Sequence, residues 1–174
     1  RTRLAREAWQ QEDTVALAEA SARLQGDPLV IYADYYLLGK QLDQTPPEAV
    51  RAFLVRYPDT WLAERLRGEY LRILGKRGDW AGVRDFLPGL QNPDQELKCL
   101  DLRARAEAEG QGSDALAEAR KLWWFTGSSL PSACAELLQL VETRGLVSTD
   151  DVWDRLRLAL QAGNSSLARR LAGK

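Results

Sequence analysis

The sequence contains no histidine. Because histidine is the usual general base of catalytic triads and the commonest protein ligand of metal ions, its absence excludes the histidine-based forms of both sites from this chain. Two cysteines are present, Cys99 and Cys134, and they lie 35 positions apart rather than at the short Cys-x-x-Cys spacing of zinc and redox sites. We therefore expect no metal and no cofactor.

Neither sign of charge is in excess, and no long hydrophobic run occurs. The 24 basic and 25 acidic residues leave a net charge of -1, so the chain lacks the basic field that attracts nucleic acid. No run approaches the roughly 18 apolar residues of a transmembrane helix, so we expect no membrane span and no nucleic-acid partner. The chain begins at Arg1 rather than at an initiator Met, which is compatible with a signal peptide that has been removed or trimmed.

The acidic residues do not form a recognisable catalytic group. Acid–base catalysis by paired carboxylates needs two acids that converge on one cleft, whereas the acids here are spread along polar faces or stand at helix starts, as Asp150 and Asp151 do. No combination of nucleophile, base and orienting residue is found. We expect no catalytic residue and no enzyme activity within these residues.

Helix-forming patterns fill the chain, whereas strand patterns are scarce. Two segments repeat apolar residues at i, i+3, i+4 and i+7, which is the spacing of one helix face. They are Val50, Phe53, Leu54 and Tyr57 in the first segment, and Cys134, Leu137, Leu138 and Val141 in the second. Turn signals recur every 32 to 35 residues, the period of helical-hairpin repeats such as the tetratricopeptide class. These turns are expected near Gln11, Asp43, Gly78, Gln111 and Leu146.

The turns share no consensus residue, so a regular tetratricopeptide array is not expected. The predicted fold class is all-α, an irregular superhelix (solenoid) of antiparallel helical hairpins that forms one domain over residues 1–174. The helix around residues 97–106 carries two apolar stripes, and stacked neighbours should therefore cover two of its sides. The stripes are Leu97, Leu100 and Ala104, and Cys99, Leu102 and Ala106.

Several helix starts carry side chains that cap unpaired backbone amides. In Thr45-Pro46-Pro47-Glu48, the pattern predicts a capping box with Thr45 as N-cap, Pro46 at the first helical position and Glu48 reaching back. Four further side chains are placed to cap helices after a glycine or a loop. They are Asp79, Ser113, Thr149 and Asn164.

Six tryptophans are many for a chain of this length, and they allow two readings. A sugar-binding groove could use indole faces, but large side chains are also what packing between helical repeats requires, so we expect core positions for most of them. Trp123 and Trp124 are neighbours and cannot share a helix face, so one of them should be the exception. The other four are Trp9, Trp61, Trp80 and Trp153.

The two cysteines lie about one repeat apart. Residues at that separation occupy equivalent positions on successive helices, whose axes lie about 8 to 10 Å apart, so facing side chains could bond. A disulfide would indicate an oxidising compartment, and two buried thiols would indicate the cytosol. From these residues alone, both alternatives stay open.

Several short segments, in order along the chain, resemble the N-terminal helical region of the soluble lytic murein transglycosylases, enzymes of the bacterial periplasm. The resemblance covers nearly the whole chain and rests on ordered matches with similar gaps rather than on one decisive motif. The segments are Pro28-Leu29 with Tyr32 and Tyr35, Phe53-Leu54 before Tyr57-Pro58, Arg77 with Asp79-Trp80, Leu122-Trp123 with Thr126-Gly127-Ser128 and Pro131-Ser132-Ala133-Cys134, and Arg155 to Leu158 followed by Ala162-Gly163-Asn164.

This resemblance implies a U-shaped superhelix that carries a separate lysozyme-like catalytic domain, in which a Glu of a Glu-Ser dipeptide cleaves the bond between N-acetylmuramic acid and N-acetylglucosamine. None of the twelve Glu residues here precedes Ser, and a Gly-Leu-Met-Gln signature cannot occur without Met, so no catalytic residue is carried over. A disulfide between Cys99 and Cys134, a periplasmic location and a contact with peptidoglycan glycan strands through the full-length protein are also implied. We expect a monomer.

The alternative reading is a free-standing helical-repeat scaffold, similar to tetratricopeptide proteins, that binds protein partners along a concave face. A cytosolic location and two free thiols would favour it. The resemblance favours a different function, in which the chain is the non-catalytic part of a transglycosylase and shapes or guides glycan strands.

Overall fold

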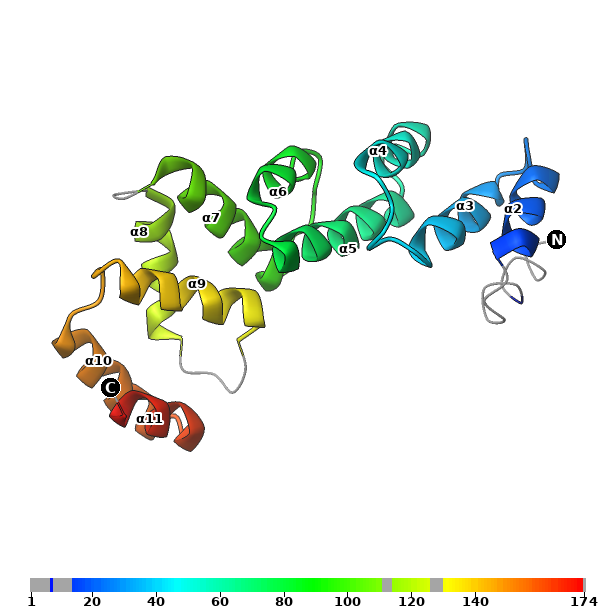
Figure 1. The fold of residues 1–174 in the computed structure, drawn as a ribbon. Coiled ribbons are helices and arrows are strands. Elements are labelled where there is room, and N and C mark those ends of the chain that lie inside the picture. Colours follow the sequence, from blue (N-terminus) through cyan, green and yellow to red (C-terminus); the bar gives the residue numbers. More distant parts are fainter. Residues whose placement is uncertain (1–6, 8–13, 111–113, 126–129, 174) are drawn as a thin grey trace. The chain divides into compact units, whose positions relative to one another are not determined.

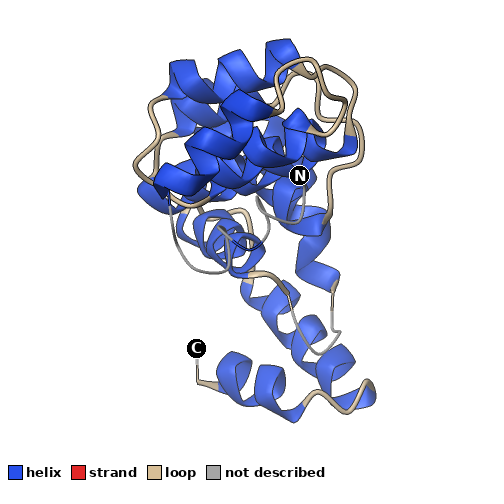
Figure 2. Cartoon of the chain, turned by 90° about the vertical axis from the view of Figure 1, so that its right-hand side faces the viewer, coloured by secondary structure: helices blue, strands red, loops and turns tan. Residues whose placement is uncertain are grey.

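A computed structural model describes residue 7 and residues 14–110, 114–125 and 130–173. Within these ranges all regular structure is helical, in ten α-helices and one 3-10 helix, and no strand occurs (Figure 2). This confirms the all-α class. No helix in these ranges is both long enough and apolar enough to cross a bilayer. Four residues of the sequence-based expectations lie outside the described ranges, together with the Thr126-Gly127-Ser128 segment. The four are Trp9, Gln11, Gln111 and Ser113.

Contacts divide the chain into two compact units. The first comprises Arg1–Ile73 with Gly89–Gln91, and the second comprises Leu74–Pro88 with Asn92–Lys174. Each unit has its own apolar core, and the expectation of a single domain over residues 1–174 stays a prediction.

The first unit holds α2, α3, α4 and most of α5 (Figure 1). In it α2 packs against α3, and α3 against α4. The core between α2 and α3 is formed by Leu17, Leu24, Val30 and Ala33. The helices are α2 (Thr14–Arg23), α3 (Val30–Gly39), α4 (Pro47–Arg56) and α5 (Trp61–Arg77).

Hydrogen bonds to two carboxylates join helices of the first unit. The Asp34 carboxylate on α3 accepts hydrogen bonds from the hydroxyls of Ser21 and Tyr57, and Arg56 lies 3.2 Å from it. The Tyr35 hydroxyl donates to the Glu69 carboxylate on α5 at 3.0 Å. Because these groups bond to one another across helices, we interpret them as structural ties.

These ties predict an alkaline limit to the stability of the first unit. Burial, reinforced by Asp34 at Tyr57 and by Glu69 at Tyr35, raises the pKa of each phenol from 10.0 to about 12. A raised folded-state pKa contributes stability that is complete below pH 10 and is lost as the pH rises through about 12. Absorbance titration of tyrosinate should show two phenols that ionise near pH 12 in the parent chain. Each of the variants Tyr35→Phe and Tyr57→Phe should show only one. Ionisation of both phenols near pH 10 in the folded chain would contradict this.

The predicted capping box at the start of α4 is wrong. Pro46 has extended backbone (φ -67°, ψ 148°) and is itself the N-cap, while Pro47 occupies the first helical position. A residue that precedes a proline is forced out of the helical region, so Pro46 cannot begin the helix when Pro47 follows it. The Thr45 hydroxyl donates instead to the Gln41 carbonyl at 2.8 Å.

The second unit holds the last turn of α5 and all later helices. In it α7 is central and packs against α6, α8 and α9, while α10 and α11 form a hairpin (Figure 1). The helices are α6 (Trp80–Phe86), α7 (Gln95–Glu109), α8 (Asp114–Arg120), η1 (Lys121–Trp124), α9 (Ser132–Thr143), α10 (Thr149–Gln161) and α11 (Ser165–Ala172).

The two stripes of α7 are both buried, as predicted. Cys99, Leu102 and Ala106 belong to the core shared with α8 and α9. On the other stripe, Leu100 lies so close to Gly75 of α5 that a Cβ there would stand 2.5 Å from a Leu100 methyl group. Arg84 of α6 donates to the carbonyl of Ala104 on the same stripe.

Three of the predicted turns are confirmed, near Asp43, Gly78 and Leu146, because each lies between consecutive helices. The predicted caps Asp79 and Asn164 are also confirmed, since their side chains accept from the amides of the third residue of each helix. The cap predicted at Thr149 is wrong.

Ser148 caps α10 in place of Thr149, and it forms a capping box with Asp151. The Ser148 hydroxyl is three residues from the Asp151 amide, which is the spacing that the box requires. Thr149 is the first helical residue instead.

Candidate functional site

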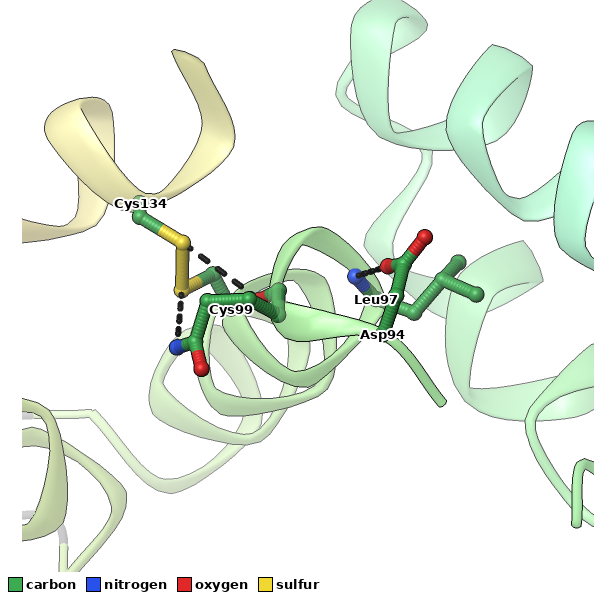
Figure 3. Close-up of a disulfide and its surroundings, with 5 residues drawn as sticks. Asp94, Leu97, Cys99 and Cys134 are labelled. Atoms are coloured by element: carbon green, nitrogen blue, oxygen red, sulfur yellow. Dashed lines mark hydrogen bonds between the residues drawn. A yellow bond between two sulfur atoms is a disulfide. The ribbon is translucent and has the colours of Figure 1, made fainter. Parts of the chain in front are cut away.

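The two cysteines are joined in the structure by a disulfide in the core of the second unit. Cys99 lies on α7 and Cys134 in the first turn of α9, with sulfurs 2.06 Å apart and Cα atoms 5.1 Å apart (Figure 3). Both side chains are fully buried. The side-chain amide of Gln95 donates to the Cys99 sulfur, and the backbone carbonyl oxygen of Gln95 lies 3.4 Å from the Cys134 sulfur. Asp94 caps α7 by accepting from the Leu97 amide at 2.9 Å. The bond thus fixes α9 to a well-capped helix.

The tryptophans only partly follow the core expectation. Trp123 is 1% exposed and its neighbour Trp124 is 40% exposed, which confirms that the pair divides between core and surface. Trp61 and Trp153 are 59% and 58% exposed, so the core expectation is wrong for both. Trp80 is half-buried, under the guanidinium of Arg103.

A pocket of about 570 Å³ lies in the second unit, between η1, α9, α10 and α11. It meets the core in which Trp123 packs with Leu138 and Leu167. Its apolar lining is Trp123, Leu130, Ala135, Leu138, Leu167 and Leu171, and its polar lining is Glu136, Gln139, Glu142, Arg155 and Arg170.

Arg155 is the unusual residue of this pocket. Its side chain is 5% exposed, and Arg155 is the buried charged residue of the described part of the chain. The guanidinium carbon lies 4.3 Å from the centroid of the Trp123 ring, within cation–π range. Its Nε has no hydrogen-bond partner. Burial lowers the pKa of the Arg155 guanidinium, and Arg170 lowers it further, whereas Glu142 opposes the shift.

The Trp123 ring under Arg155 is fixed from its other edge. Its indole Nε1 donates to the backbone carbonyl of Asp151, in the first turn of α10, at 3.2 Å. The Asp151 carboxylate accepts from Ser148 and pairs with Arg120 at 3.0 Å. Hydrogen bonds from Ser148 and Arg120 lower the pKa of Asp151. The aromatic face below the guanidinium is therefore rigidly held.

The sequence-based expectations did not include this pocket, although the sequence contained a signal for it. Val152, Arg155, Leu156 and Ala159 follow the i, i+3, i+4, i+7 template, so Arg155 occupies a core-facing position of an amphipathic helix. A charged residue at such a position is rarely buried without a partner. In the sequence, Arg155 also begins the Arg155 to Leu158 segment of the family resemblance.

Chemically, the pocket combines a buried cation with two carboxylates and an amide, which suits it to binding a polar ligand. In the described part of the chain, the Asp101 carboxyl group has a raised pKa. Burial is the main cause of the rise, Glu118 adds to it, and Arg105 opposes it. Asp101 lies on α7 beside Arg105 and does not line the pocket. The described residues also include no cluster of acids and cysteines arranged to hold a metal ion.

The chain is similar to curated proteins named soluble lytic murein transglycosylase. It is 30% identical to the protein of Escherichia coli (strain K12) over 170 residues, which is 97% of this chain and 26% of that protein. The protein of Salmonella typhimurium LT2 matches with the same identity and coverage. No family model matches the chain.

Solved structures give the same result at the level of the fold. The chain superposes on an inactive mutant of the lytic transglycosylase Slt from Pseudomonas aeruginosa with a TM-score of 0.80 and 30% identity, over 97% of this chain and 27% of that one. For the 70 kDa soluble lytic transglycosylase from Escherichia coli, the TM-score is 0.81 at 28% identity, with the same coverage. Both the fold class and the family resemblance are confirmed. The chain is homologous, over nearly its whole length, to about a quarter of a soluble lytic murein transglycosylase.

Proposed function

We propose that this chain is a non-catalytic helical part of a periplasmic soluble lytic transglycosylase, where it shapes or guides peptidoglycan glycan strands during cell-wall turnover. The observation that carries the proposal is the homology, which covers 97% of this chain but only 26% of the relative. The catalytic chemistry belongs to other parts of such an enzyme. This chain acts as a monomer and as one domain.

The chemistry of the side chains supports a non-catalytic role. None of the twelve Glu residues precedes Ser, so the Glu-Ser dipeptide expected for the transglycosylase reaction is missing from these residues. Glu136 and Glu142 line the one pocket that holds a buried charge in the described part of the chain, but the buried group is a cation, Arg155. A buried cation binds anionic groups and does not protonate a glycosidic oxygen.

The cysteine pair supports an extracytoplasmic location. Disulfides persist in oxidising compartments such as the bacterial periplasm and are rare in the cytosol. The bond between Cys99 and Cys134 in the structure therefore disfavours the alternative of a cytosolic scaffold with two free thiols.

Two measurements on the purified chain test the proposal. In a zymogram with murein embedded in the gel, we expect no zone of clearing from the chain, beside a lysozyme lane that does clear. In co-sedimentation with purified murein sacculi, we expect the chain in the pellet and serum albumin in the supernatant. Clearing by the chain would overturn the non-catalytic role, and absence from the pellet would overturn the contact with glycan strands.

A further inference from the structure

We propose that the Arg155 pocket binds the terminal carboxylate of a short peptide, and that in murein this is the peptide carried by the glycan strands. The second part rests on the proposed function. The first part, binding of a peptide carboxylate, rests only on the pocket. This part adds a ligand site to a region for which only a guiding role has been proposed.

The first argument is the state of the Arg155 side chain. Only 5% of its surface is exposed, and its Nε donor has no partner. A buried donor without a partner is costly, and more so on a charged group, so a folded chain rarely retains one that nothing uses. Arg155 also lines the pocket, so part of its side chain borders the space that an acceptor would occupy.

The second argument concerns which acceptor fits. A guanidinium is a planar fork that binds a carboxylate through two parallel hydrogen bonds. The guanidinium carbon lies 4.3 Å from the centroid of the Trp123 ring, and that ring is held by its hydrogen bond to Asp151, so the fork packs against a positioned side chain. A preorganised fork loses less side-chain entropy when the ligand binds.

The third argument distinguishes a peptide from phosphate. Two acidic side chains, Glu136 and Glu142, line the same pocket, and they would repel the double charge of a phosphate more than the single charge of a carboxylate. The Glu136 and Glu142 carboxylates and the Gln139 side-chain carbonyl can also accept hydrogen bonds from the N–H groups of a peptide, and a phosphate has no such groups. The mixed lining therefore matches a peptide end, in which a carboxylate stands next to amide groups.

The fourth argument is the remaining surface of the pocket. Leu130, Leu138 and Leu171 give it an apolar side, which suits the methyl groups of alanine-like residues. Its volume of about 570 Å³ lies within the range of about 300 to 1,000 Å³ typical of small-ligand pockets. The pocket can thus hold two or three small residues of a peptide.

Isothermal titration calorimetry on the whole chain tests the site. The probe is diacetyl-L-lysyl-D-alanyl-D-alanine, and its C-terminal amide is the matched ligand without the charge. We expect binding of the free acid, at least tenfold weaker binding of the amide, and at least tenfold weaker binding of the acid by Arg155→Met. Arg144→Met removes the same charge from an exposed position outside the pocket, and it should bind as the parent chain does.

Thermal melting separates a ligand site from a structural arginine. If Arg155 is retained for binding, the apolar side chain of Arg155→Met should leave the melting temperature equal or higher, because a buried donor without a partner is removed. A lower melting temperature together with no peptide binding by the parent chain would overturn the proposal, since Arg155 would then be a packing residue. Equal peptide binding by the parent and Arg155→Met would also overturn it.

Two further probes identify the ligand class. Tighter binding of inorganic phosphate than of the peptide would overturn the proposal in favour of a phosphate site. Co-sedimentation with sacculi stripped of peptides by an amidase distinguishes the two proposals. Weaker co-sedimentation after stripping supports the peptide site, and unchanged co-sedimentation without peptide binding in calorimetry overturns it while leaving the glycan-guiding role intact.

Discussion

Removal of the Cys99–Cys134 disulfide is expected to lower the free energy of unfolding by about 4 kcal/mol. The bond joins residues 35 positions apart, and the chain-entropy relation for a loop of that length gives roughly this figure. Native domains are stable by only about 5 to 15 kcal/mol, so the loss would be a large part of the total. The second unit depends on it most, because α7 and α9 meet at the bond.

Thermal melting of the parent chain and of a Cys99→Ala, Cys134→Ala double variant measures this effect. We expect the double variant to melt lower by roughly 10 °C or more. A phosphine reductant should lower the melting temperature of the parent chain by a similar amount and leave the double variant unchanged. Without reductant, alkylation should modify neither cysteine, and rapid alkylation of both would show that the bond is not formed in solution.

The amphipathic patterns identified the helices and the two buried stripes of α7 because burial of one helix face requires apolar residues at fixed spacing. Turns near Asp43, Gly78 and Leu146 could be predicted for a similar reason, since helix breaks there depend on local signals. The caps at Asp79 and Asn164 are equally local. These features depend on neighbours within a few residues, and a sequence records those neighbours directly.

Errors arose where two local rules competed or where tertiary packing decided. At Thr45 the capping pattern was overruled by the second of two consecutive prolines. At Thr149 and Ser148 two adjacent hydroxyls could cap α10, and the pairing with Asp151 selected Ser148. Neither choice could be read from residue type alone.

The candidate site depends on tertiary packing even more. Burial of Trp123 and exposure of Trp61 and Trp153 follow from which helices lie against them, and helical spacing does not give this. The helical spacing of Arg155 predicted a buried position, whereas its charge predicted an exposed one. Only the arrangement of η1, α9, α10 and α11 shows that it is buried without a partner for its Nε.

Trp123→Ala is expected to destabilise the chain by about 3 to 5 kcal/mol, the range for removing a large aromatic side chain from a core. Trp123 is 1% exposed and packs with Leu138, Leu167 and other residues between η1, α9, α10 and α11. Its removal leaves a cavity, takes the hydrogen-bond donor from the Asp151 carbonyl and exposes the buried Arg155 guanidinium to that cavity. The cavity, the lost hydrogen bond and the exposed guanidinium therefore all destabilise the same part of the second unit.

Urea unfolding followed by circular dichroism measures the effect, and the neighbouring tryptophan provides the control. Trp124 is 40% exposed, so Trp124→Ala removes the same side chain from the next residue and should cost no more than about 1 kcal/mol. Trp123→Phe keeps a ring under Arg155 but loses the indole N–H, and it should fall between the two. Equal destabilisation by Trp123→Ala and Trp124→Ala would mean that the ring under Arg155 does not hold η1 to α10, and the pocket would then lack the rigid base on which its proposed selectivity depends.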